Sequence, residues 1–106
     1  MTDSLLATWK EKFSFTESAE REFNGLPPEV QKAFLKAFPE FSKHPWRATP
    51  TLDVDHLRDM PNRWRLKVAG GHRGIYRSLQ GVPDFEMFET RDQVYEKLRR
   101  YFNSRP

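Results

Sequence analysis

The sequence contains no cysteine, no long apolar run and no internal repeat. Without cysteine the chain has neither a disulfide framework nor a thiolate metal site, which fits a reducing compartment. No apolar segment approaches the roughly 20 residues of a bilayer-spanning helix. Leu5, Leu6 and Ala7 are not preceded by the charged stretch of a signal peptide. We therefore expect a cytoplasmic protein that makes no use of a membrane.

The length of 106 residues is sufficient for one domain with a core of its own. Nine phenylalanines, three tryptophans and three tyrosines supply bulky core material. The net charge of +3 permits an anionic partner without requiring one. We expect a single domain over residues 12–106. Residues 1–11 are expected to form an N-terminal extension, either loose or anchored on the surface by Trp9.

A short strand and two helices are predicted in the first half of the chain. The strand covers residues 12–15, and Thr16 is a suitable N-cap for a first helix that ends near Gly25. Pro28 fits the first position of a second helix. Apolar residues recur there at helical spacing: Val30, Ala33, Phe34, Ala37, Phe38 and Phe41. Pro39 predicts a kink or break at Phe38, so we expect a helical hairpin.

Residues 62–79 are predicted to form two strands joined by a turn at Gly70 and Gly71. Cationic and apolar residues alternate in the first strand: Arg63, Trp64, Arg65, Leu66, Lys67 and Val68. The two kinds should therefore face opposite sides of a sheet. The second strand adds Arg73 and Arg77. Residues 61–80 hold five of the 18 basic residues and none of the 15 acidic ones, so the basicity is local to this hairpin.

The remaining segments complete an α+β pattern. Leu52, Val54 and Leu57 can pack as a short strand or turn, and residues 85–88 form a third strand of the meander. A helical pattern resumes at Arg91. We expect helices on one face of an antiparallel sheet and cations on the other.

Four segments in this order resemble the RelE/ParE superfamily of type II toxins. They are residues 13–19 (FSFTESA), 26–30 (LPPEV), 57–76 and 91–95 (RDQVY). The third contains L-x-x-x-P, a basic strand and R-x-x-Y. The resemblance spans residues 12–101. It implies a RelE-like fold: an N-terminal strand and helical hairpin, then an antiparallel meander and a C-terminal helix.

The resemblance also implies a function. RelE-like toxins cut mRNA in the ribosomal A site without a metal or other cofactor. The 2′-hydroxyl attacks the adjacent phosphate and leaves a 2′,3′-cyclic phosphate and a 5′-hydroxyl. The implied partners are a cognate antitoxin, the ribosome and mRNA, and operator DNA only through the antitoxin.

Matching the family motifs assigns candidate site residues. The catalytic set is Arg65, Lys67, Arg73 and Tyr95. Either Lys67 or Tyr95 would act as the base, and Arg73 would stabilise the phosphorane charge or assist the leaving group. The RNA-contacting set is Arg63, His72, Arg77 and Arg91, and His72 could also act as an acid or base.

Other functions remain open on the sequence. Glu89 departs from the RelE pattern, which tends to be basic just before the late motif, and this allows weaker catalysis, a shifted geometry or a different target. ParE toxins share the fold but poison DNA gyrase, and a non-catalytic protein that only binds a partner or nucleic acid is a third hypothesis. The Lys67, Arg73 and Tyr95 set favours the nuclease. Asp53, Asp55 and Asp59 lack the glycine and glutamate of a calcium loop, so no metal site is expected.

Overall fold

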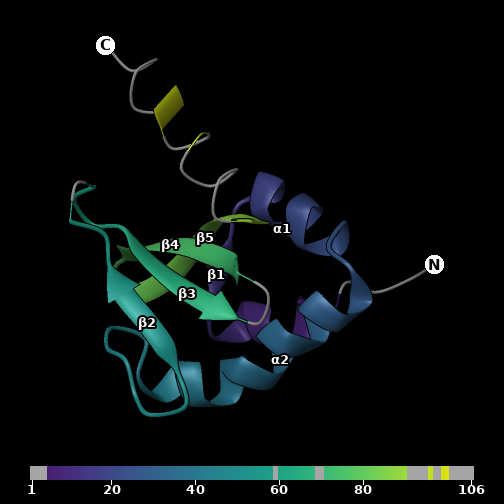
Figure 1. Cartoon of the computed structure of the whole chain (residues 1–106), viewed down its shortest axis with the longest axis horizontal. Helices are drawn as coiled ribbons and strands as arrows, with labels where there is room; N and C mark the ends of the chain where they lie inside the picture. The colour runs from purple at the N-terminus through teal and green to yellow at the C-terminus, as the bar shows by residue number, and fades with distance from the viewer. Residues whose placement is uncertain (1–4, 59, 69–70, 91–95, 97–98, 101–106) are drawn as a thin grey trace.

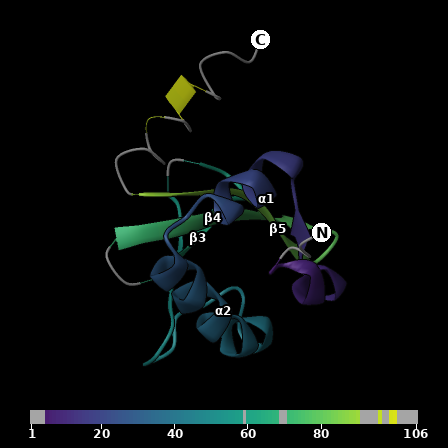
Figure 2. The ribbon, with the colours of Figure 1, turned by 90° about the vertical axis from the view of Figure 1, so that its right-hand side faces the viewer.

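The computed structural model describes residues 5–58, 60–68, 71–90, 96 and 99–100. In chain order the elements are a 3₁₀ helix η1 (Ala7–Glu11), β1 (Ser14–Phe15), α1 (Glu17–Asn24), α2 (Pro28–Lys43), β2 (Asp53–His56), β3 (Trp64–Val68), β4 (His72–Leu79) and β5 (Val82–Thr90). Both α-helices lie on one side of the sheet (Figures 1 and 2). The predicted α+β architecture is confirmed.

The sheet has five strands in the order β1-β5-β4-β3-β2. Strands β2 to β5 form an antiparallel meander, and β1 closes the opposite edge by pairing in parallel with β5. The sequence predicted about three strands in the meander. The fourth is β2, from the segment that was expected to be a short strand or a turn.

A β-bulge interrupts the pairing of β4 with β5. Ile75 pairs with Met87 but Tyr76 pairs with Phe85, so Glu86 is an extra residue on β5. Because of this extra residue, Phe85 and Phe88 both join the core under the helices, although they are an odd number of positions apart.

The core between helices and sheet is built from aromatic rings. Phe85 lies at its centre, with these ring neighbours: Phe13, Phe15, Phe38, Phe41, Tyr76 and Phe88. Edge-to-face and offset-stacked pairs of this kind add to the energy of simple burial. The predicted stripe of Phe34, Phe38 and Phe41 is fully buried here, which confirms its role as core.

Gly74 lies on β4 beneath two of these rings. A Cβ atom at this position would stand 3.0 Å from Cε1 of Phe85 and 3.0 Å from Cε1 of Phe88. Contacts this short would force the rings to move. The glycine therefore lets β4 pass directly under the aromatic core while its neighbours Arg73 and Ile75 face the other side of the sheet.

The helix signals are realised with one exception. Thr16 caps α1, and its Oγ1 accepts a hydrogen bond from the Ala19 N–H at 3.0 Å. Of the kink or break expected at Phe38, the break does not occur: α2 runs without interruption from Pro28 to Lys43, with Pro39 inside it. The buried phenylalanine face of α2 holds the helix together across the proline.

The N-terminal extension packs onto the core from Leu6 onward. Leu6 is fully buried. The Trp9 ring stacks on Phe13 with centroids 5.6 Å apart and meets Phe38 edge-on at 5.5 Å. Trp9 therefore contacts the core as an anchor would.

The predicted C-terminal helix lies largely outside the described residues, as do Arg91 and Tyr95. Glu96, Arg99 and Arg100 are described and are helical. Within the described ranges, no helix combines the length and apolar character that crossing a bilayer would need.

Tyr76, the tyrosine of the R-x-x-Y segment, is a core residue. It is fully buried, and its hydroxyl donates a hydrogen bond to the Pro45 carbonyl. Burial raises the pKa of this phenol well above its ordinary value of 10.0. The hydroxyl therefore ties the segment after α2 to the sheet.

We expect Tyr76→Phe to destabilise the fold by about 1 kcal/mol at neutral pH, because one buried hydrogen bond is lost. The difference should shrink above about pH 10, where Tyr76 ionises in the unfolded wild type but not in the folded one. Urea unfolding of both proteins across this pH range measures the difference. A constant gap would contradict the assignment.

Candidate functional site

Two rows of directly opposed residues cross the sheet face away from the helices. The first is Asp53, Lys67, Arg73 and Glu89, and the second is Asp55, Arg65, Ile75 and Met87. Opposed residues on neighbouring strands point to the same face, with Cβ atoms about 4.5–5.5 Å apart. Three candidate catalytic residues, Arg65, Lys67 and Arg73, are therefore neighbours on this face.

Arg73 is the most enclosed member of this group. Only 5% of its surface is exposed, and its Nη1 donates to the Gly71 carbonyl at 3.4 Å. The Arg65 side chain is 21% exposed, and its guanidinium lies 3.4 Å from the carboxylate of Asp55. Lys67 stands between Asp53 and Arg73, so its neighbours carry charges of both signs.

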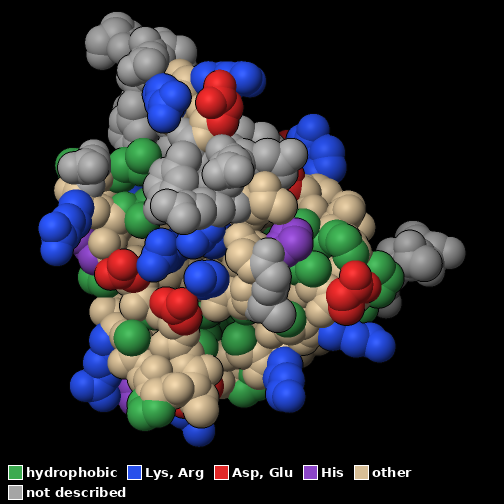
Figure 3. Space-filling view, in the orientation of Figure 1, with side chains coloured by type: hydrophobic (Ala, Val, Ile, Leu, Met, Phe, Trp, Pro, Cys, Tyr) green, Lys and Arg blue, Asp and Glu red, His purple; other side chains and the backbone are tan. Residues whose placement is uncertain are grey.

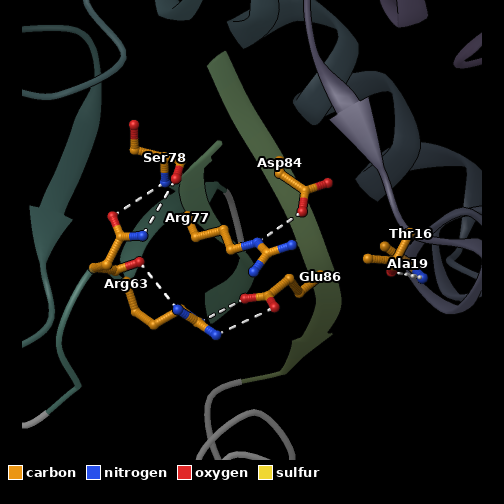
Figure 4. A network of polar contacts seen from close by, with 8 residues as sticks. Thr16, Ala19, Arg63, Arg77, Ser78, Asp84 and Glu86 are labelled. Atoms are coloured by element: carbon orange, nitrogen blue, oxygen red, sulfur yellow. Dashed lines mark hydrogen bonds and ion pairs between the residues drawn. The ribbon is translucent and has the colours of Figure 1, made fainter. Parts of the chain in front are cut away.

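Arg63 and Arg77 lie at the other end of the strands, in an ion-pair network (Figure 4). The Arg63 Nε is 2.6 Å from Glu86, and the Arg77 Nε is 3.0 Å from Asp84. Arg63 and Asp84 are buried. These two predicted RNA-contacting arginines are thus parts of a structural network, apart from the Lys67 and Arg73 row.

The carboxyl group of Glu86 is unusual within this network. Burial raises its pKa, while the positive charges of Arg63 and Arg77 oppose that rise. The pKa of Glu86 is raised overall, because burial outweighs these charges and the nearby Asp84 adds repulsion. A carboxyl group held this way takes up a proton more readily than an exposed one.

Each of the five cations of the hairpin faces an acid. Glu86, Asp55, Asp53, Glu89 and Asp84 stand opposite Arg63, Arg65, Lys67, Arg73 and Arg77, respectively. Figure 3 shows Lys and Arg side chains interspersed with Asp and Glu over β2 and β3. The cations expected on this face lie there, and acids from β2 and β5, on either side of the hairpin, lie among them.

His72 takes a different position from the other candidates. Its register partners are Val68 and Thr90, so it belongs to the helix-facing side at the end of the sheet. With Glu22, Glu89 and Thr90, among other residues, it lines a cavity of about 270 Å³. Its Nδ1 is buried, with no hydrogen-bond partner among the described atoms.

An apolar cluster interrupts the charged face. Ile75 is fully buried there and packs with Leu57, Met60 and Met87. The cluster separates the Lys67 and Arg73 row from the Arg63 and Arg77 network. By strand alternation Ile75 shares its face with Arg73 and Arg77, but local alternation does not indicate this second core.

A larger hollow lies off this face, between α2 and the ends of β2 and β3. Its volume is about 800 Å³, and its lining includes Ala33, Ala37, Lys67 and Asp53 but neither Arg65 nor Arg73. It therefore does not unite the candidate residues, and size alone does not make it the site. Among the described residues no group of three or more His, Asp or Glu side chains could hold a metal ion.

Solved structures similar to this one identify the fold, whereas no protein-family model and no curated protein sequence matches the chain. The structure is similar to RelE of a RelB-RelE antitoxin-toxin complex from Methanococcus jannaschii, with a TM-score of 0.63 and 14% identity over 79% of this chain and 96% of the other. It is also similar to a double-arginine mutant of the E. coli toxin RelE in complex with a RelB antitoxin peptide, with a TM-score of 0.61 and 22% identity over 81% and 90% of the two chains. The fold is RelE-like, as predicted.

Proposed function

We propose that this chain is the toxin of a type II toxin-antitoxin system and cuts mRNA in the ribosomal A site. The direct pairing of Lys67 with Arg73 carries this proposal. The similar solved structures were both determined with a RelB antitoxin or antitoxin peptide, which supports an antitoxin as partner here.

The paired cations suit the chemistry of RNA cleavage. A guanidinium grips a phosphate through two parallel hydrogen bonds, and an adjacent ammonium adds a second positive charge. Arg73 is held rigidly by burial, so it can stabilise the phosphorane without reorganising. Arg65, in the next row, is placed to contact the RNA backbone.

The test is primer-extension mapping of messages after brief induction of this protein alone. Wild type should create new 5′ ends inside translated codons. Arg73→Ala should lower their yield on the order of 10²–10³-fold, as loss of one preorganised charge does. Lys32→Ala is the matched control, since it removes an exposed cation from α2, on the other side of the sheet.

Folding must be separated from chemistry because Arg73 is buried. Urea unfolding of Arg73→Ala and Arg73→Lys shows whether either variant retains a cooperative fold. If Arg73→Lys folds but does not cleave, the guanidinium is required. If toxicity survives Arg73→Ala and Lys67→Ala combined in one folded protein, the nuclease proposal is wrong.

One observation favours a second function. The acids opposite all five cations reduce the attraction of this face for RNA, as expected of a toxin that binds a protein such as DNA gyrase. In that case induction would arrest growth with DNA damage and no new message ends. A non-catalytic binding protein would give neither effect.

A further inference from the structure

Glu89 occupies the end of the row that contains Lys67 and Arg73. It is the direct partner of Arg73 on β5, so the two side chains share the face away from the helices. Glu89 is partly exposed, whereas Arg73 is buried. A phosphate held by Arg73 would therefore lie within reach of the Glu89 carboxylate.

The row of Asp53, Lys67, Arg73 and Glu89 supplies two cations, but cleavage of RNA also needs a group that accepts the 2′-hydroxyl proton. Lysine and arginine side chains ordinarily carry their protons at neutral pH, whereas a glutamate is ordinarily ionised and can accept one. Asp53, the other acid of the row, stands beyond Lys67 on the exposed edge strand β2. Glu89 is thus the acid of this row that directly neighbours the buried arginine.

Glu89 is also one of the residues that line the cavity of about 270 Å³ at the end of the sheet, together with Glu22 and His72. The titratable and charged groups around Glu89 among the described residues are therefore Arg73 across the strand, and Glu22 and His72 around this cavity. The Glu89 side chain points to the opposite face from this cavity, so a ribose would approach its partly exposed carboxylate from the solvent over the outer face.

We infer that Glu89 is the general base of the cleavage, an inference that rests on the proposed function. The Glu89 carboxylate accepts the 2′-hydroxyl proton as the 2′-oxygen bonds to phosphorus. The bond from phosphorus to the 5′-oxygen breaks, and that oxygen takes a proton from water. Arg73 and Lys67 hold the phosphate throughout. The departure from the basic RelE pattern at this position then supplies the catalytic base.

The test measures cleavage of ribosome-bound message as a function of pH. Glu89→Gln should lower kcat/KM on the order of 10²–10⁴-fold and remove the acidic limb of the pH profile. Glu89→Asp should restore part of the rate and keep that limb. The matched control is Asp53→Asn, which removes the same charge from the other end of the row and should leave the profile unchanged.

The outcomes distinguish this inference from the function on which it rests. If wild type does not cleave, both fail. If wild type cleaves and Arg73→Ala does not, but Glu89→Gln keeps the wild-type rate and profile, the inference alone is overturned. A faster Glu89→Gln enzyme would also overturn it, since the carboxylate would then only oppose RNA binding.

Discussion

Replacing Phe85 with alanine is expected to destabilise the fold by about 3–5 kcal/mol, the cost of emptying a buried phenylalanine site. Phe85 is fully buried and lies at the centre of the aromatic core. Its ring stacks on Phe15 at 5.4 Å and on Phe88 at 5.1 Å. Removing it opens space between α2 and the sheet that no neighbouring ring can fill without leaving its own contacts.

Urea unfolding followed by circular dichroism measures this loss. The matched control is Val82→Ala on the same strand, because Val82 is 39% exposed and should change stability by no more than about 0.5 kcal/mol. Equal effects of the two substitutions would show that Phe85 is not central to the core.

The second large effect is expected at Arg63. Arg63→Met removes the closest cation from the half-buried Glu86 carboxylate and should cost about 3 kcal/mol, the lower end of the range for breaking a buried pair from one side. The cost should be smaller near pH 5 than near pH 8. With Arg63 gone, burial raises the pKa of Glu86 further, so at acid pH the group is neutral and its burial costs less.

A double-mutant cycle isolates this pair. Arg63→Met with Glu86→Leu should be markedly more stable than Arg63→Met alone, since no unpaired carboxylate remains. Urea unfolding of the four proteins at both pH values gives the coupling energy. Additive losses, or a cost independent of pH, would show that the ion pair contributes little.

The sequence predicted which face each side chain of the basic hairpin takes. Leu66 is fully buried and Trp64 and Val68 pack against the core, as their alternation with the cations indicates. It did not predict the acids that lie among the cations of the opposite face. Charge on a sheet depends on which strands are neighbours, and Asp55 and Glu89 reach Arg65 and Arg73 only through tertiary pairing.

For the candidate site too, the sequence predicted which residues lie on the hairpin but not which of them are paired across strands. The sequence placed Lys67 and Arg73 on neighbouring strands, but their direct pairing depends on the length of the turn between them, which the glycines alone do not fix. The role inferred for Glu89 does not follow from local spacing, because β5 and β4 had first to be placed in register. Glu89 nevertheless stood out in the sequence, because it is an acid at a position where the RelE pattern tends to be basic.

The extra residue at Glu86 has a consequence for how such a protein can diverge. It divides β5 into two segments whose side-chain alternation is set independently. The segment before it supplies Phe85 to the interior, and the segment after it supplies Glu89 to the outer face. Outer-face positions such as Glu89 can therefore change over evolution while Phe85 and Phe88 keep the interior unchanged, so one scaffold can carry several chemistries.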